Sequence, residues 1–516
     1  MKKTEKRRYT KSPMPWRFVI SAILVLLQIL LTIVLFYIAK QTYVWVRVFY
    51  SAIWIIFLLV ILNREESASY KLPWAVTILL FPIAGIVLLL MFGKPGLSPK
   101  AHRRFKKANR DRTSYLVQNE EVKEGLGELD ADGLSISNYL KTTAKMPVYG
   151  NTSSEYLNSG EQFFERLKQD IKQAKEYVFL EFFIVSEGKL WQETLEILKQ
   201  KAKEGVRVYL LYDDFGSMKK APENIEKICE KAGIKCFAFN PVYPIISVVY
   251  NNRDHRKIAV IDGQIAYTGG INLADEYANL ITLFGHWKDC GIRLTGDAVD
   301  GFVAMFIENY NVASDKLLKV GEHLREHQSI ESSGFVQPFG DGPRPVDEDY
   351  IGQTLYLSII NSAKKYLYIA SPYFIVDTSM IEAIETASKR GVEVKILTPH
   401  IPDKKSVFIM TRSSYARLIK AGVKIYEYKP GFVHSKIVLC DDRLGVVGSI
   451  NFDYRSFVHS YECGAMLYGT QSLLDIKSDY LQTIDKCGLL QTKESAKLKW
   501  QERIIKNIAG LFAPLL

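Results

Sequence analysis

The feature that most constrains this 516-residue chain is an internal duplication. The motif His-x-Lys-x-x-x-x-Asp occurs twice, and each copy is followed at the same distance by a small-residue turn and an asparagine. The copies comprise His255, Lys257, Asp262, Gly269, Gly270 and Asn272, and then His434, Lys436, Asp441, Gly448, Ser449 and Asn451. In a chain with only eight histidines, chance predicts such a triplet on the order of a few hundredths of a time. The pair therefore predicts one site built from two halves, with a histidine from each.

The duplication extends well beyond the motifs. Matching segments precede them in both copies: 174–184 with 363–375, 205–211 with 391–397, and 232–237 with 421–426. Downstream, His286-Trp-Lys-Asp-Cys-Gly matches His459-Ser-Tyr-Glu-Cys-Gly. Asp289 and Glu462 therefore occupy equivalent places, and a repeat of the whole unit makes chance an unlikely origin of the motifs.

Each copy predicts an α/β fold. Apolar residues recur at helical spacing in Gln162–Lys175 and Leu190–Glu204. Short β-branched and aromatic runs predict buried strands at Tyr177–Phe183, Val206–Tyr212, Ile258–Ile261, Tyr366–Ala370, Val392–Leu397 and Ile437–Leu439. We therefore expect two pseudo-symmetric halves, each a mixed sheet flanked by helices. Each His-x-Lys pair should lie on a strand, with both side chains on one face.

Charge is distributed unevenly along the chain. The formal net charge is +11, and residues 1–112 alone carry 19 Lys and Arg against four Asp and Glu, a net of +15. The remaining residues therefore carry a net of −4. Because a nucleic-acid enzyme normally has an electropositive groove, this distribution argues against nucleic acid as a partner. The basic flanks favour the anionic surface of a membrane.

Three apolar stretches lie in this basic region. Phe18–Ala39 and Leu72–Gly93 each contain 22 residues without a charge. As helices they would be about 33 Å long, enough for a hydrocarbon core about 30 Å thick. Val48–Leu62 is shorter and is bracketed by two arginines. We expect two or three transmembrane helices in residues 1–112, and the basic flanks predict a multi-pass cell-membrane protein with its catalytic portion in the cytoplasm.

Composition also predicts how the rest of the chain is divided. We expect a linker, a first half, a connection, a second half and an amphipathic C-terminal helix at 113–145, 146–328, 329–344, 345–490 and 491–516. The terminal helix should either lie at the membrane interface or dock on the second half. Val242–Asn251 is an apolar insertion of the first half, either an acyl-chain entrance or an ordinary buried loop. The six cysteines show no metal-ligand spacing.

These residues resemble a known family. The paired motifs are similar to those of the phospholipase D superfamily, and the wider chain resembles the bacterial cardiolipin synthases, from about Asn63 to Leu516. The resemblance rests on Asn252-Arg-Asp-His-Arg-Lys-Ile-Ala-Val-Ile-Asp, Gly269-Gly-Ile-Asn-Leu-Ala-Asp-Glu-Tyr, Asn451-Phe-Asp-Tyr-Arg-Ser-Phe and the ending Ala509-Gly-Leu-Phe-Ala-Pro-Leu-Leu. It implies that two phosphatidylglycerol molecules give cardiolipin and glycerol, with His255 as nucleophile and His434 as acid and base.

The chemistry of the residues fits such an exchange independently. A phosphodiester is anionic, so Lys257 and Lys436 can neutralise it, while Asn272 and Asn451 can donate hydrogen bonds to its oxygens. One neutral imidazole can attack phosphorus and form a phosphohistidine, and the second can protonate the leaving glycerol. The exchange replaces one phosphodiester by another, so we expect no metal and no nucleotide cofactor.

Four carboxylates of the repeat are further candidate site residues. Asp289 and Glu462 are candidates for orienting a histidine and fixing its tautomer. Asp262 and Asp441 belong to the motif, and either take part in catalysis or stabilise the strand end.

Two other classes of function stay open from the sequence. A membrane-bound phospholipase D-type hydrolase would share the covalent step, with water taking the phosphatidyl group. A membrane scaffold without activity would be marked by loss of a motif histidine or lysine, and the sequence retains all four.

Overall fold

The computed structural model describes residues 26, 27, 30, 33, 34, 37, 44–64, 68–92, 99–241, 252–314, 316–344, 346–490 and 498–513. The chain forms two compact units. The smaller comprises residues 1–95 with 241–250, and the larger comprises residues 96–240 with 251–516. Both copies of the repeat lie in the larger unit. Phe18–Ala39 falls largely outside the described residues, and Val242–Asn251 lies outside them entirely.

Helices in the smaller unit differ in length from the predicted apolar stretches, since the first begins before Val48 and the stretch Leu72–Gly93 is divided between two helices. They are α2 (Val44–Leu62), α3 (Ala68–Leu80) and α4 (Pro82–Phe92). The expected single helix at Leu72–Gly93 is wrong: the chain breaks at Phe81, because Pro82 lacks an N–H and its ring favours the first position of a new helix. Among the residues that the structure describes, no helix is long and apolar enough to cross a membrane.

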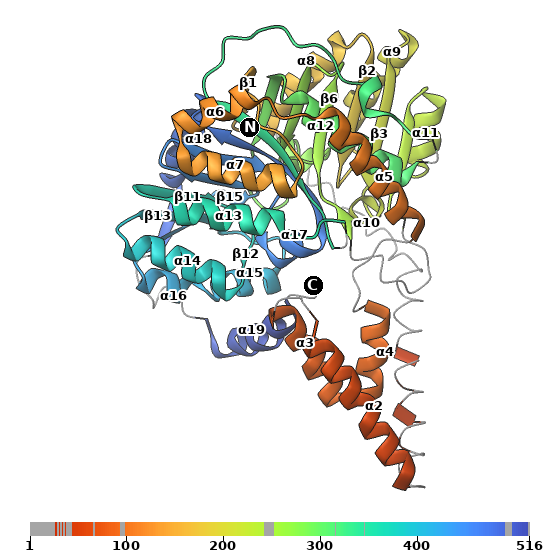
Figure 1. Cartoon of the computed structure of the whole chain (residues 1–516), viewed down its shortest axis with the longest axis vertical. Coiled ribbons are helices and arrows are strands. Elements are labelled where there is room, and N and C mark those ends of the chain that lie inside the picture. The colour runs from red at the N-terminus through yellow and green to blue at the C-terminus, as the bar shows by residue number, and fades with distance from the viewer. Residues whose placement is uncertain are drawn as a thin grey trace, which may run out of the picture. The chain divides into compact units, whose positions relative to one another are not determined.

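The first half of the larger unit is a seven-stranded mixed sheet, drawn in yellow and green in Figure 1, in the order β1-β9-β7-β6-β2-β3-β4. Its strands are β1 (Thr152–Leu157), β2 (Tyr177–Phe182), β3 (Arg207–Asp213), β4 (Lys235–Phe239), β6 (Lys257–Ile261), β7 (Ile265–Gly269) and β9 (Gly291–Gly296). Its helical segments are α8 (Gly160–Gln173), α9 (Lys189–Lys203), α10 (Asp214–Ser217), α11 (Ile225–Lys231), η2 (Asp275–Ala278), α12 (Val299–Ala313) and η3 (Val320–Glu322). The expected strands and helices are confirmed to within two residues at most ends.

The second half repeats this order as β10-β19-β17-β16-β11-β13-β14, and β20 extends the edge. Its strands are β10 (Phe335–Asp341), β11 (Tyr366–Ala370), β13 (Glu393–Pro399), β14 (Lys424–Tyr428), β16 (Ile437–Cys440), β17 (Leu444–Gly448), β19 (Ser460–Tyr468) and β20 (Cys487–Leu490), with a separate pair β12 (Phe374–Ile375) and β18 (Phe452–Asp453). Its helices are α13 (Ile351–Ser362), α14 (Thr378–Lys389), α15 (Lys405–Arg412), α16 (Tyr415–Lys420), α17 (Tyr454–Val458) and α18 (Ser472–Ile484). The common strand order confirms that the duplication is structural.

Two of the predicted connections contain regular secondary structure. The stretch expected to be a linker contains α6 (Glu120–Leu129) and α7 (Ala131–Thr143), and the connection 329–344 contains β10, an edge strand of the second sheet. The basic helix α5 (Pro99–Tyr115) packs against α12 rather than belonging to the smaller unit. Its buried Arg112 lies 3.5 Å from Glu308 of α12, which anchors it to the first half.

Two short strand pairs join the halves. β5 (Arg253–Asp254) of the first half pairs in parallel with the start of β19, and β8 (His286–Lys288) pairs in parallel with β15 (Gly431–Val433) of the second half. The core is continuous as well, because one cluster of buried side chains includes Phe306 from α12 and Val446 from β17. The two halves are therefore fixed against each other, which positions a site at their junction.

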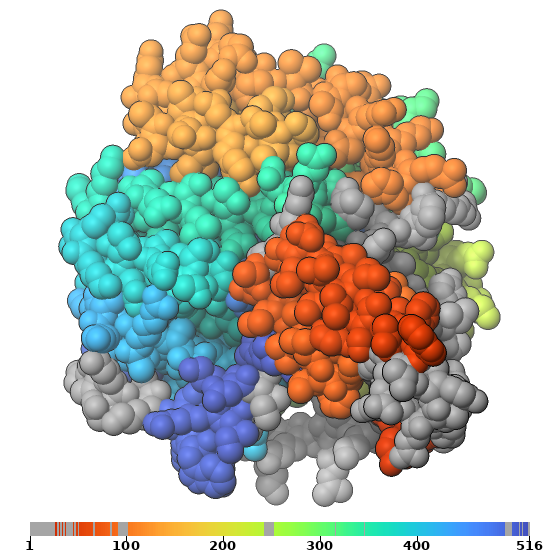
Figure 2. Space-filling model, turned by 60° about the horizontal axis from the view of Figure 1, so that its bottom comes forward, coloured from red at the N-terminus to blue at the C-terminus, as the bar shows by residue number. Residues whose placement is uncertain are grey.

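The C-terminal helix α19 (Trp500–Phe512) confirms that residues near the end are helical. It lies next to α15 of the second half, and Figure 2 shows it in dark blue at the surface. Trp500 and Ile504 are among its exposed apolar side chains.

Candidate active site

Each motif histidine lies in the link between two short strands rather than on a strand, contrary to the sequence prediction. His255 follows β5 and precedes β6, and its backbone N–H donates to the carbonyl of Tyr461, 2.9 Å away. Since β5 pairs with β19, this contact brings the imidazole to the next residue of the other half, Glu462. The Nδ1 atom of His255 lies 2.9 Å from each carboxylate oxygen of Glu462.

His434 is held in the same way by the opposite half. Its backbone N–H donates to the carbonyl of Lys288 over 2.7 Å, because β15 pairs with β8. Its Nδ1 atom lies 2.7 Å from Oδ2 of Asp289. The histidine of each half therefore hydrogen-bonds the carboxylate of the other, a crossed arrangement that the repeat alone did not predict.

Both histidines have aromatic neighbours that sequence reasoning missed. The ring of Phe183 lies 5.0 Å from that of His255, and the rings of Tyr277 and Trp287 lie 5.3 and 5.4 Å from that of His434. These distances join ring centroids, and such contacts fix the plane of each imidazole. Tyr277 is the last residue of the segment Gly269–Tyr277 that follows the first motif, and this place in the sequence was the signal that could have identified it as a site residue.

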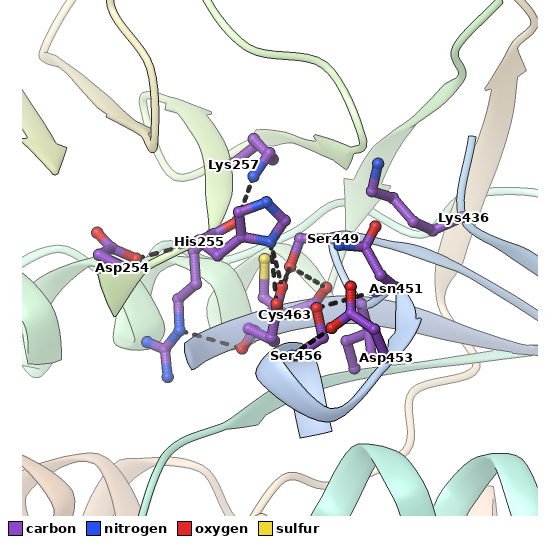
Figure 3. A network of polar contacts seen from close by, with 12 residues as sticks. Asp254, His255, Lys257, Lys436, Ser449, Asn451, Asp453, Ser456 and Cys463 are labelled. Carbon is purple, nitrogen blue, oxygen red and sulfur yellow. Dashed lines mark hydrogen bonds and ion pairs between the residues drawn. The ribbon is translucent and has the colours of Figure 1, made fainter. Parts of the chain in front are cut away.

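Ser449 is a further partner of the His255 pair. Its hydroxyl donates to Oε2 of Glu462 and accepts the backbone N–H of Cys463 at 2.9 Å. Figure 3 shows Ser449 beside the His255 ring, with Lys257 on the opposite side. Gly270 occupies the equivalent place in the first half, where an added Cβ would lie 2.2 Å from Asp289. The longer Glu462 with Ser449 therefore corresponds to the shorter Asp289 with Gly270.

The motif lysines are almost wholly buried beside the histidines. The ammonium of Lys257 donates to the carbonyl of His255, and that of Lys436 donates to the carbonyl of His434 and lies 2.9 Å from its Nδ1. Burial lowers the pKa of Lys257 to about 8 and that of Lys436 to about 7. Both therefore titrate close to neutral pH.

Burial and these cations act on the other titratable groups too. Burial, with Lys436 next, lowers the pKa of His434 to about 3, and burial with Lys257 holds the pKa of His255 well below its usual value. Burial raises the pKa of Glu462 to about 8. Burial also acts to raise the pKa of Asp289, but His434 and Lys436 outweigh it and the pKa is lowered. Both imidazoles are therefore neutral at neutral pH, and Asp289 is the more firmly ionised carboxylate.

The two asparagines face the same pocket with different hydrogen bonding. Asn272 accepts the backbone N–H of Ile184 at 3.0 Å and donates to the hydroxyl of Tyr277 at 2.7 Å, so its amide is used within the protein. Asn451 is 5 % exposed, and among the described residues its buried Oδ1 has no hydrogen-bond partner. Of the two amides, that of Asn451 is thus the one left to meet a ligand.

The motif aspartates lie elsewhere. Asp262 accepts the backbone N–H groups of three consecutive residues, 175–177, at 2.7 to 2.8 Å. Asp441 accepts those of residues 364–366 at the same distances. Both have a positive φ, 53° and 56°, at the turn after the motif strand, and neither lines the pocket. Their hydrogen bonds hold the backbone at the start of β2 and of β11, away from the pocket.

One pocket of about 660 Å³ brings the histidines together within the larger unit. His255, His434, Asn272 and Asn451 all line it, and the motif lysines are not among its lining residues. Much of its wall is aromatic or aliphatic: Phe183, Ile184, Phe215, Leu283, Phe284, Trp287, Tyr373, Ile375, Val407, Met410 and Phe432. An apolar pocket with a few convergent polar groups suits a lipid with a polar headgroup.

Comparison with known proteins agrees with this architecture. The family model described as cardiolipin synthase, PLD-like domain, matches residues 167–281 and 356–486, and the model described as phospholipase D-nuclease N-terminal matches residues 52–94. An uncharacterised protein of Streptococcus mutans is 38 % identical over 89 % of this chain and 99 % of its own length. A cardiolipin synthase of Geobacillus sp. is 34 % identical over 90 % of this chain and 92 % of its own.

A solved structure shares the fold. The crystal structure of phosphatidylserine synthase from Haemophilus influenzae has a TM-score of 0.57 and 17 % identity, covering 73 % of this chain and 96 % of that chain. The fold and the paired site thus define an enzyme of two phospholipase D-like halves. Within that class, the chain belongs to the cardiolipin synthase family. The resemblance inferred from the motifs is confirmed.

Proposed function

We propose that the protein transfers a phosphatidyl group from one phosphatidylglycerol molecule to another, giving cardiolipin and glycerol. The observation that carries this proposal is the crossed pairing of both motif histidines with carboxylates in one apolar pocket. The names of the curated relatives are consistent with it.

The first step uses the two histidines on opposite sides of the donor phosphorus. Once the anionic phosphodiester is bound, one histidine is an imidazolium and the other is neutral. Nε2 of the neutral imidazole attacks, the bond from phosphorus to the glycerol oxygen breaks, and the imidazolium gives that oxygen its proton. In the second step this histidine takes a proton from a hydroxyl of the acceptor, whose oxygen attacks phosphorus while the phosphorus–nitrogen bond breaks. One phosphodiester replaces another, so no nucleotide energy is consumed.

We assign His255 as the nucleophile and His434 as the acid and base. Asp289 is the more firmly ionised carboxylate and lies 2.7 Å from His434, so it can stabilise the imidazolium that proton transfer requires. Glu462 has a pKa raised to about 8 and stabilises a cation at His255 less. A neutral imidazole with its Nδ1–H on Glu462 presents the Nε2 lone pair that a nucleophile needs.

The remaining motif residues have supporting parts in this proposal. Lys257 and Lys436 reduce the negative charge at the phosphate, and Asn451 donates to a non-bridging oxygen once its amide is turned toward it. Asn272 orients Tyr277 against His434. Asp262 and Asp441 are structural.

Product analysis tests the function directly. Purified full-length protein in detergent is given phosphatidylglycerol alone, without nucleotide or added metal, and products are identified by mass spectrometry. Cardiolipin with glycerol supports the synthase. Phosphatidic acid with glycerol, and no cardiolipin, would make the protein a phospholipase D-type hydrolase instead.

We further propose that the N-terminal unit holds the enzyme at the cell membrane, with the catalytic unit, roughly 146–328 and 345–490, on the cytoplasmic side. The basic residues of 1–112 support it, since each basic group near an anionic bilayer contributes about 1 kcal/mol. Membrane fractionation tests this: recovery in the membrane pellet after a high-salt wash is expected, and recovery in the supernatant would refute it.

A further inference from the structure

The pocket is built from a repeat, yet equivalent positions on its two sides carry different charged residues. Aligning Gly269 with Gly448 places Glu276 of the first half opposite Arg455 of the second. Aligning the two histidines places Arg253, two residues before His255, opposite Phe432, two residues before His434. All four of these residues line the pocket.

The crossed arrangement assigns each charge to one histidine. Arg253 precedes His255, and the charge of Arg455 helps to lower the pKa of that imidazole. Glu276 precedes Tyr277, whose ring contacts His434 at 5.3 Å, and Phe432 lies 6.0 Å from the same imidazole, ring to ring. The His255 side thus has two guanidinium groups, that of Arg253 lying 3.7 Å from Asp213, while the His434 side has a carboxylate that is paired with Lys220.

Glu276 has the features of a ligand-binding group. Its side chain is 2 % exposed, and Oε1 lies 2.6 Å from the ammonium of Lys220. Oε2 is buried and, across the part of the chain that the structure describes, has no hydrogen-bond partner. A buried carboxylate oxygen without a donor costs free energy, which a hydroxyl group of a bound molecule would recover.

We propose that Oε2 of Glu276 accepts a hydrogen bond from the glycerol headgroup, at the hydroxyl next to the reacting oxygen. This inference rests on the proposed phosphatidyl transfer and adds a specificity-determining residue to it. The leaving oxygen and the attacking oxygen both lie on the side of the acid and base, His434, which is where Glu276 is.

One subsite can serve both half-reactions because the two substrates share a fragment. In donor phosphatidylglycerol, the oxygen bound to phosphorus is on a terminal carbon of the glycerol headgroup, and the adjacent carbon carries a free hydroxyl. In the acceptor, the attacking primary hydroxyl has the same neighbour. Glu276 would therefore hold the leaving glycerol and then the incoming headgroup in one register.

Competition between two small acceptors tests this. Full-length enzyme in detergent receives phosphatidylglycerol with equal concentrations of deuterated glycerol and 1-propanol, and mass spectrometry gives the ratio of deuterated phosphatidylglycerol to phosphatidylpropanol. Both products come from the same covalent intermediate, so the ratio is independent of how fast that intermediate forms. 1-Propanol has three carbons but lacks the neighbouring hydroxyl.

We expect wild type to favour glycerol and Glu276→Gln to lose about tenfold of that preference, the effect of one hydrogen bond to a charged group. Glu276→Asp, which withdraws the carboxylate by one methylene, should also reduce it. The matched control is Glu196→Gln, which removes an exposed carboxylate that lies 2.6 Å from Lys199 and should leave the ratio unchanged.

The outcomes separate this inference from the proposed function. An unchanged ratio in folded Glu276→Gln, or in Glu276→Asp if the glutamine variant does not fold, overturns the inference, and so does an equal fall in Glu196→Gln. Wild type that forms phosphatidic acid but no cardiolipin overturns the synthase instead, and loss of glycerol preference in Glu276→Gln would still uphold the glycerol subsite.

Discussion

The substitution Asp289→Asn tests the crossed pairing most directly. The asparagine keeps the size of the side chain but removes the charge that lies 2.7 Å from Nδ1 of His434. A hydrogen bond to a charged group contributes about 1.5–3 kcal/mol, and each 1.4 kcal/mol is a factor of about ten in rate. We therefore expect kcat to fall by roughly 10- to 150-fold, because the imidazolium of His434 and its tautomer are no longer stabilised.

The matched control is Asp262→Asn, which makes the same substitution at another aspartate of the first half that does not line the pocket. Asparagine tolerates the positive φ of 53° at this position. The change weakens the hydrogen bonds to the backbone of residues 175–177, so we expect a loss of about 1–3 kcal/mol in the free energy of unfolding and an unchanged kcat per folded molecule.

Both variants are assayed by initial rates of cardiolipin formation and by urea denaturation. A kcat within threefold of wild type for folded Asp289→Asn would refute the role of the carboxylate at His434. A large loss of kcat in Asp262→Asn without loss of stability would return that residue to the catalytic machinery.

Three further predictions concern the same unit. His255→Ala and His434→Ala should each abolish turnover, and acid-labile phosphate on the protein should be trapped only where the nucleophile remains; normal activity in either would sink the two-histidine mechanism. Since burial lowers the pKa of Lys436 to about 7, its ammonium loses its proton as pH rises from about 6 to about 8, so kcat/KM should fall over that range. Asp289→Asn should move the fall to lower pH in a pH–rate profile, because that ionised carboxylate raises the lysine pKa; an unmoved limb would argue against this coupling. Glu308→Ala leaves two buried arginines without their carboxylate and should cost about 3–5 kcal/mol in urea denaturation, whereas a change below about 1 kcal/mol would mean the ion pairs contribute little.

The sequence predicted the larger unit well because its information is local and repeated. Short β-branched and aromatic runs identified β2 and β11, and the duplication identified two similar halves, which share a strand order in the structure. The roles of the turn residues Asp262 and Asp441 were ambiguous from the sequence. Their repeated spacing in the motif is the same whether the carboxylate contacts substrate or accepts hydrogen bonds from the backbone. Only the contacts with three backbone N–H groups separate the two.

What the sequence could not predict depends on contacts between distant segments. The exchange of partners between His255 and Glu462, 207 residues apart, follows from the pairing of β5 with β19, and a two-residue strand has no periodicity to detect. The apolar composition of Leu72–Gly93 likewise predicted one long helix, because an average over the stretch does not register the helix break at Pro82. The acidic, Gly-containing run at Glu120 reads as a linker in isolation and becomes helical against its neighbours.

Because strands of one half pair with strands of the other, the active site can assemble only after most of the chain has been synthesised. When the ribosome has produced only the first half, His255 has neither Glu462 nor the β19 backbone that holds it, so the nucleophile is not yet oriented. The site becomes competent only after residue 462 has emerged and the last long strand has docked. A chain that has been made only as far as the first half therefore contains His255 but not the assembled site.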